Sequence, residues 1–318
     1  MARREPWPFC GEPYLVERRE RIPPKDFQLL REINDAINRR HRPGQAFEIT
    51  DEEAAHHERI AAGAGSIDMI SGERCYLEPR PHKGPVALVP VLQLYARDVP
   101  ELPFPEDTDL FQLLWCPNWH DGPWHGPAPL TIWRRAADVT EPLPTPPAPR
   151  FEDDWEWCAR DYVPLPCVLH PERVTEYPHP CNLPAQYPHA CNLPVELAER
   201  IEQWDERHDD LYWTALSTAP GTKVGGHPRW IQAPEWPVCG CGRRMQHLLT
   251  VASEEFANRE RWLPLEDRDD PRITGQRLLI DRDCWAPHGV MLGDVGSLYL
   301  FTCTARPERP LGGTMQCT

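Results

Sequence analysis

Proline is the residue that most constrains this chain, because it fills 39 of the 318 positions. That is more than twice its ordinary share. A proline can neither donate a hydrogen bond to a neighbouring strand nor continue a helix. The chain must therefore fold as short helices and strands joined by stiff loops. The stretch from 141 to 150 is dominated by proline and is interpreted as a linker or an extended segment on the surface.

Residues 1–70 carry helical patterns and are predicted to form an N-terminal helical segment. Apolar residues recur three or four positions apart across Phe27–Ile37, which is typical of one face of a helix. Thr50 and Glu53 then form a capping-box pattern, which predicts the start of a second helix. Further along, proline at the first turn of Pro194–Ile201 indicates another short helix.

Short apolar runs of strand length occur in pairs in both halves of the chain. The runs are Val89–Tyr95, Leu110–Cys116, Met245–Ala252 and Leu298–Cys303. The second run of each pair ends in cysteine, although the two cysteines are one residue out of register when the apolar residues are aligned. The likeness predicts an internal duplication, with chance similarity between apolar strands as the alternative.

These patterns predict an α+β fold of mainly antiparallel sheets, with an internal duplication, short peripheral helices and proline-rich loops. The expected domains are the helical segment, a first strand-rich repeat with its linker over 71–150, and a second repeat over 151–318.

Charge and hydropathy restrict the partners of the chain. The formal net charge of -15 disfavours nucleic acid and suits a basic protein partner. No apolar run approaches the roughly 20 residues of a membrane helix. The charged start, Met1–Pro6, lacks the apolar core of a signal peptide. We therefore expect a cytoplasmic protein with no membrane partner.

The best candidate for chemistry is a cysteine pair, Cys239 and Cys241, on either side of Gly240. Glycine permits the positive φ that a metal knuckle requires, and thiolates suit zinc. Cys303 is the natural third ligand if its strand pairs beside Met245–Ala252. Four residues qualify as a fourth ligand: His247, Cys284, His288 and Cys317. A structural zinc site is weighed against a tight turn with two half-buried thiols.

A tandem repeat and a tryptophan cluster are two further candidates. The repeat supplies the soft ligand set His179, Cys181, His189 and Cys191. Duplicated proline-rich loops usually carry no chemistry, and that interpretation is favoured. Tryptophans that could form a partner-binding surface are Trp115, Trp119, Trp124, Trp133 and, in the second half, Trp230. The alternative is a core capped by prolines.

No catalytic residue is assigned from the sequence. The carboxylate groups, such as Asp153–Asp154 and Asp269–Asp270, fall in polar loops, where a solvated face is the favoured interpretation. No phosphate-binding loop, nucleophile elbow or zinc-protease helix pattern occurs.

An ordered series of motifs resembles the YwqG-like family, a bacterial group of unknown function. The motifs are Lys223–Gln232, Cys239–Met245, His247–Thr250 and Gly293–Phe301. They are also distantly similar to the domain of eukaryotic programmed-cell-death protein 2, whose leucine-glutamine-leucine-tyrosine run resembles Leu92–Tyr95.

The resemblance covers about Ala219 to Arg309 and implies antiparallel sheets with an internal repeat. It implies no established catalytic residue. Eukaryotic relatives are thought to escort a ribosomal protein, and some bacterial relatives sit among toxin and immunity genes. Arg306 stands where a second cysteine would help to complete a zinc site in the eukaryotic pattern.

The sequence therefore favours a non-enzymatic protein-binding module, either a client-protein chaperone or a toxin-immunity protein. The alternative is a metal-dependent enzyme or nucleic-acid-processing factor that uses the cluster of Cys239, Cys241 and Cys303.

Overall fold

The structure is a computed structural model, and the chain forms two compact units in it. One unit comprises 13–82, and the other comprises 1–12 together with 83–318. The residues that the structure describes are 6–41, 47–122, 124–151, 156–178, 193–256, 262–270 and 285–317. The predicted division at residue 70 differs from this one, because residues 73–80 pair with a strand that begins at Tyr14.

The unit of residues 13–82 combines a small antiparallel sheet with two helices. Its elements are β1 (Tyr14–Arg21), α1 (Pro24–Arg40), α2 (Asp51–Ala61), β2 (Ser66–Asp68) and β3 (Glu73–Arg80), with β3 in the middle of the sheet. Both predicted helices are confirmed, and Thr50 and Glu53 form the predicted capping box. Strand β1 was not predicted, because the residues Glu17–Arg21 in it are all charged.

The larger unit contains two antiparallel meanders. The first consists of β4 (Val89–Tyr95), β5 (Leu110–His120) and β6 (Gly126–Arg134). The second consists of β7 (Lys223–Val224), β8 (Gln246–Ala252), β9 (Ser297–Thr302) and β10 (Leu311–Gln316). Short helices lie between the strands: η1 (Ala136–Asp138), α3 (Glu156–Asp161), α4 (Val195–Asp205), η2 (Tyr212–Leu216) and η4 (Leu265–Asp267).

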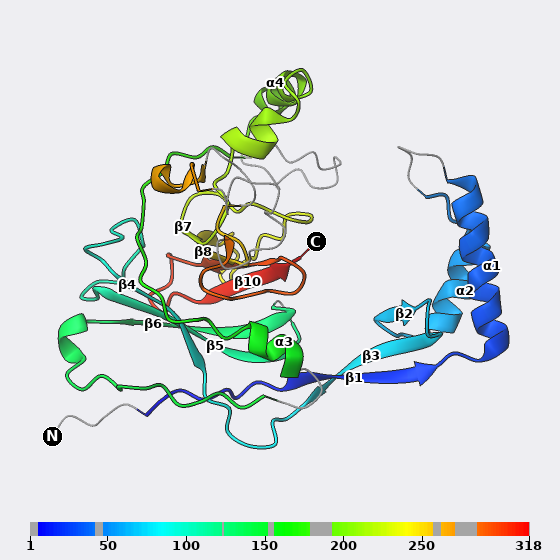
Figure 1. The fold of residues 1–318 in the computed structure, drawn as a ribbon, viewed down its shortest axis with the longest axis horizontal. Coiled ribbons are helices and arrows are strands. Elements are labelled where there is room, and N and C mark those ends of the chain that lie inside the picture. Colours follow the sequence, from blue (N-terminus) through cyan, green and yellow to red (C-terminus); the bar gives the residue numbers. More distant parts are fainter. Residues whose placement is uncertain are drawn as a thin grey trace. The chain divides into compact units, whose positions relative to one another are not determined.

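The α+β fold with mainly antiparallel sheets is confirmed, as are the four predicted strands (Figure 1). The edge strands β6 and β10 were not predicted. Pro127 and Pro129 interrupt the apolar pattern of β6, and Gly312 and Gly313 weaken that of β10. An edge strand tolerates such residues because one side of its backbone needs no partner. No helix in the described parts of the chain is long and apolar enough to cross a membrane.

The two meanders share their register, which supports the predicted duplication. The pair β4–β5 and the pair β8–β9 each contain one bulge, between Pro90 and Leu92 in β4 and between His247 and Leu249 in β8. The partner of the first residue of β4 is Trp115, and the partner of the first residue of β8 is Thr302.

Cys116 and Cys303 directly follow these two partner residues, Trp115 and Thr302. The two cysteines therefore occupy equivalent positions. The one-residue offset expected from the sequence was wrong, because aligning apolar residues does not reveal the strand register.

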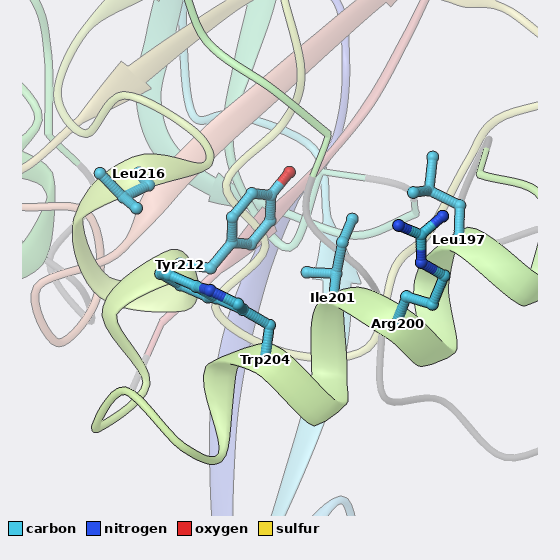
Figure 2. A pocket seen from close by; sticks show the side chains of 6 residues that line it. All are labelled: Leu197, Arg200, Ile201, Trp204, Tyr212 and Leu216. Atoms are coloured by element: carbon cyan, nitrogen blue, oxygen red, sulfur yellow. The ribbon is translucent and has the colours of Figure 1, made fainter.

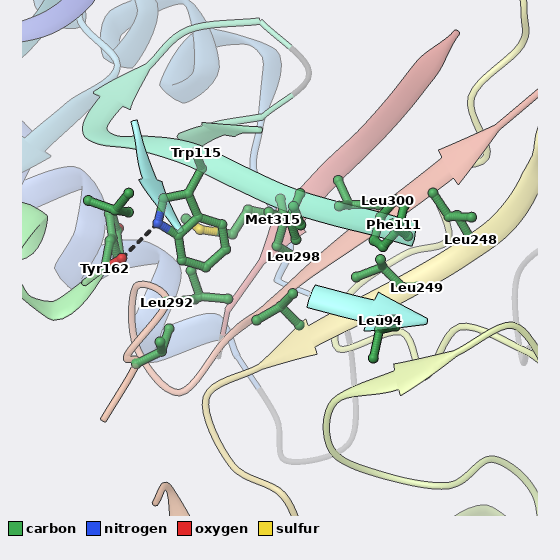
Figure 3. Close-up of a cluster of buried hydrophobic side chains, with 14 of the residues drawn as sticks. Leu94, Phe111, Trp115, Tyr162, Leu248, Leu249, Leu292, Leu298, Leu300 and Met315 are labelled. Atoms are coloured by element: carbon green, nitrogen blue, oxygen red, sulfur yellow. Dashed lines mark hydrogen bonds between the residues drawn. The ribbon is translucent and has the colours of Figure 1, made fainter. Parts of the chain in front are cut away.

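One core joins the two meanders (Figure 3). Alternate residues of β5, Phe111, Leu113 and Trp115, belong to the same buried cluster as Leu298 and Leu300 of β9. The indole Nε1 of Trp115 donates a hydrogen bond of 2.7 Å to the carbonyl of Tyr162, which satisfies its buried N–H.

The opposite faces of β5 and β9 are also buried. Leu114 and Cys116 of β5 contact a second cluster with Trp7, Val86 and Leu88. The corresponding face of β9 carries Tyr299 and Phe301, which pack with Met245, Trp230 and Trp236. Cys303, directly after the strand, belongs to the same cluster. Each inner strand therefore contributes to the shared core on one face and to a cluster under an irregular segment on the other.

Replacing Phe111 by alanine tests the shared core, because this side chain is fully buried between the meanders. We expect the variant to lose about 3–5 kcal/mol of unfolding free energy, measured by urea unfolding. Val168→Ala is the control: its side chain is 80% exposed, and the expected change is within about 0.5 kcal/mol. Equal small effects in both variants would contradict this account of the core.

Candidate functional site

The cysteine pair lies on a tight hairpin before β8. Val238 and Arg244 form a β-bridge, and the N–H of Cys239 donates to the carbonyl of Arg243 at 2.8 Å. The residue with positive φ is Gly242, at +82°, and not the expected Gly240. Gly242 lets the chain turn back at no steric cost, and its N–H donates to the carbonyl of Cys239 at 2.8 Å.

The structure brings Cys239, Cys241 and Cys303 together, as the sequence predicted. Their sulfur atoms lie within 4.8 Å of one another, and those of Cys241 and Cys303 are 3.7 Å apart. Cys239 and Cys303 are buried, whereas Cys241 is exposed. This spacing suits three thiolates that converge on one ion, because Zn–S bonds are about 2.3 Å long.

The local electrostatics favour a thiolate at Cys241. A backbone hydrogen bond from Arg243, followed by a hydrogen bond from the Cys239 thiol, lowers the pKa of Cys241 below its ordinary value. Arg306 forms an ion pair with Glu308, and its guanidinium lies close enough to Cys239 and Cys241 to interact with their charge. Three thiolates around a divalent ion carry one net negative charge, which this guanidinium offsets.

None of the proposed fourth ligands joins this cluster in the described residues. His247 uses one ring nitrogen at the carbonyl of Gly225, at 2.8 Å, and the other at the hydroxyl of Thr250, at 2.9 Å. His288 lies 3.2 Å from a carboxylate oxygen of Glu255. Cys317 also stands apart from the three cysteines, and Cys284 lies outside the described residues.

The second ligand set proposed from the tandem repeat also lies outside the described residues. These are His179, Cys181, His189 and Cys191.

The tryptophans proposed as a partner-binding surface are mostly structural. Trp115 is fully buried and lies in the shared core, so its ring offers no surface to a partner. Trp119 and Trp124 are partly buried and pack against the same core. Trp230 packs against Trp236 and Tyr299, with ring centroids 5.7 Å and 4.8 Å away. The expectation of an exposed tryptophan surface is corrected for Trp115 by its position on the inner face of β5.

Gly226, within the Lys223–Gln232 motif, has a structural explanation. The carboxylate of Glu176 accepts hydrogen bonds from the N–H of Ala219 at 2.7 Å, from the N–H of His227 and from the ammonium of Lys223 at 2.8 Å. A Cβ on Gly226 would overlap this carboxylate, and the backbone there has φ of +66°. These contacts hold Ala219 and His227 to the same carboxylate as Lys223 of β7, so this part of the motif has a structural role.

An apolar groove lies between α4 and η2 and was not predicted (Figure 2). Its cavity measures about 340 Å³ and is lined by Leu197, Arg200, Ile201, Trp204, Tyr212 and Leu216. The carboxylate of Asp205 accepts hydrogen bonds from the N–H groups of Tyr212 and Trp213, at 2.6 Å and 3.0 Å, and so fixes η2 to the end of α4. The sequence signal that could have revealed the groove is the amphipathic pattern of α4, whose apolar residues Leu197, Ile201 and Trp204 lie on one face of the helix.

No protein-family model, curated protein or solved structure matches this chain. The likeness to YwqG-like proteins therefore remains a prediction, and any function must be argued from the chain's own residues.

A Cys241→Ser variant tests the metal site at the hairpin. We expect it to bind one zinc equivalent fewer than the unmodified protein, measured by elemental mass spectrometry after dialysis, because the site loses one of its three thiolates. Cys167→Ser removes another exposed thiol and is the matched control, with unchanged zinc. Equal zinc in Cys241→Ser and in the unmodified protein would exclude the site.

His247 predicts a pH-dependent contribution to stability. Burial, and then the charge of Lys223, lower its pKa to about 3, against an ordinary value of about 6.5. Between these values the unfolded chain binds a proton that the folded protein excludes, so stability falls with falling pH by up to about 1.4 kcal/mol per pH unit. His247→Gln should lack this slope. We expect the difference in unfolding free energy between the two proteins to shrink from pH 7 to pH 5, and a constant difference would contradict this assignment.

Proposed function

We propose that this protein is a non-enzymatic protein-binding module, and that the groove between α4 and η2 binds a basic, amphipathic segment of its partner. The single observation that carries this proposal is an exposed apolar groove on an element rich in carboxylates.

Exposed apolar side chains lie on α4 and η2 and beside them. Val195, Leu197, Leu211 and Trp213 are 69%, 40%, 41% and 48% exposed, and Leu197 lines the groove itself. Exposed apolar groups gathered around a hollow are typical of interaction sites, whereas single exposed apolar residues are ordinary. Trp204 stacks on His208 with ring centroids 3.9 Å apart, so the aromatic floor of the groove is ordered before a partner binds.

The charges around the groove select the class of partner. Acidic residues outnumber basic ones in and directly after α4, where only Arg200 and Arg207 carry positive charge. The acidic residues are Glu196, Glu199, Glu202, Asp205, Glu206, Asp209 and Asp210. Asp205 is buried and holds η2 in place, while the others lie on α4 and in the turn after it; Arg200 is the one charged residue among those that line the groove. Carboxylates next to an apolar hollow favour a segment with one apolar face and lysine or arginine on the other, and they speed its association.

Two synthetic amphipathic peptides of identical apolar pattern, one with lysine and one with glutamate on the polar face, test this proposal. We expect the basic peptide to bind at least about tenfold more tightly, a difference of about 1.4 kcal/mol, in fluorescence anisotropy. Raising the salt from about 0.1 M to about 1 M should weaken its binding, because the Debye length falls from about 10 Å to about 3 Å.

Leu197→Lys is the variant that locates the site, because it places a positive charge on the rim of the groove. It should weaken the basic peptide at least about tenfold. Leu265→Lys is the matched control, since Leu265 is 75% exposed on η4. Equal binding of the two peptides, or equal binding by the two variants, would overturn the proposal.

A second candidate, metal-dependent catalysis, is favoured by one observation. Cys241 is exposed at a cluster to which the described residues contribute only three ligands. A metal with an open position can activate water. In the cobalt-substituted protein, an absorption spectrum that changes on adding azide would favour this candidate. An unchanged spectrum would favour a closed structural site.

A further inference from the structure

The strand register of the larger unit points to a second place where soft ligands gather. Cys303 contributes to the cluster on the outer face of β9, and Cys116 occupies the equivalent position on β5. Each cysteine faces away from the shared core, into a cluster covered by an irregular segment. If the two meanders are related by duplication, the environment of Cys116 is where a counterpart of the hairpin site belongs.

Cys10, Cys116 and His120 form such a set. Their ligand atoms all lie within 4.8 Å of one another, and the sulfur of Cys10 is 3.8 Å from Nε2 of His120. Cys116 is fully buried and His120 is 2% exposed. Buried sulfur and imidazole ligands are the donors that zinc prefers.

A bulge at the end of β5 brings Cys116 and His120 together. Cys116 pairs with Ala128 and His120 pairs with Gly126, so the strand carries two extra residues over this interval. Residues four apart in a regular strand are separated by about 13 Å. The bulge shortens that distance, and bulges of this kind commonly re-aim side chains at functional sites.

The third ligand arrives on the N-terminal segment, defined here as residues 6–12. Phe9 forms a β-bridge with Ala87, and the N–H of Cys10 donates to the carbonyl of Val86 at 2.8 Å. The indole N–H of Trp7 donates to the carbonyl of Leu88 at 3.0 Å. These contacts lay the segment beside 86–88 and place the thiol of Cys10 against the outer face of β5.

A polar side chain, Asn118, lies beside the sulfur of Cys116. The amide of Asn118 lies 3.7 Å from the sulfur of Cys116 and donates at 3.2 Å to the carbonyl of Arg150. The side chain of Asn118 is fully buried. An N–H donor beside a ligand sulfur orients the ligand and offsets its charge, which is the usual arrangement around a structural metal.

We propose that Cys10, Cys116 and His120 bind a zinc ion that fastens the N-terminal segment to the outer face of β5. The proposal does not depend on the peptide-binding function above. Zinc in structural sites takes four ligands, so one more donor completes the shell. Binding releases the two thiol protons to solvent and leaves the oxidation state of every atom unchanged. The competing chemistry at this place is a disulfide between Cys10 and Cys116.

Zinc content in a set of cysteine variants tests the proposal. We expect two zinc equivalents in the unmodified protein, one in Cys10→Ser and one in Cys303→Ser, measured by elemental mass spectrometry on protein purified with a thiol reductant. Cys167→Ser, which removes an exposed thiol, should retain both. Full zinc in Cys10→Ser, or a Cys10–Cys116 disulfide in the mass spectrum of unreduced protein, would overturn the proposal.

X-ray absorption on Cys303→Ser gives a second test that does not require altering the new site. Here the hairpin site is disabled, and the remaining zinc should show two sulfur ligands and at least one imidazole. A shell of oxygen alone or of sulfur alone would overturn the assignment. Removing this zinc with a chelator should also speed hydrogen exchange at the N–H of Cys10, and unchanged exchange would show that the ion does not fasten the segment.

Discussion

The larger unit depends on one physical interaction, the apolar contact between its two meanders. A meander of three or four strands has an apolar face that must be covered. Here each sheet covers the other, through Phe111 and Trp115 of β5 and Leu298 and Leu300 of β9. The strands β5 and β9 lie inside their sheets and are buried on both faces, which explains their continuous apolar sequences. In the described strands of the two meanders, prolines and glycines fall on edge strands, where the backbone needs fewer partners, except for Pro117 at the bulge of β5.

This arrangement leaves each sheet with a second apolar face to cover. Segments without regular secondary structure cover these second faces. Residues 6–12 cover β5, and the residues around Trp230 and Cys239 cover β9. Such segments make few ladder hydrogen bonds and pay a large entropic cost on ordering. A metal ion held jointly by the covering segment and the inner strand would offset that cost. The two cysteine clusters therefore lie at equivalent places, each between an inner strand and the irregular segment that covers it.

The groove between α4 and η2 forms independently of the shared core. Its residues take no part in the shared core, and a single buried carboxylate, Asp205, holds the two short helices together. The apolar face of α4 packs against η2 and not against the shared core, and we propose that it binds a basic partner segment.

The sequence by itself determined the elements that have strong local signals. The helices at Phe27–Ile37 and after Thr50, and the strands β4, β5, β8 and β9, follow from periodicity and capping. The pair Cys239 and Cys241 was predictable from its spacing, whereas Cys303 depended on the expected pairing of its strand beside Met245–Ala252. Local patterns suffice where the atoms that interact lie close together in the chain.

Tertiary structure alone decided the rest. Cys10 and His120 are 110 residues apart, and no local pattern links them. The equivalence of Cys116 and Cys303 needed the strand register, since a shift of one residue turns every side chain to the other face. The position of Trp115 depended on the same choice, because only the register of β5 decides whether this ring enters the shared core or the cluster on the opposite face of the strand. Register and long-range contact are properties of the paired strands, and a single run of residues does not specify them.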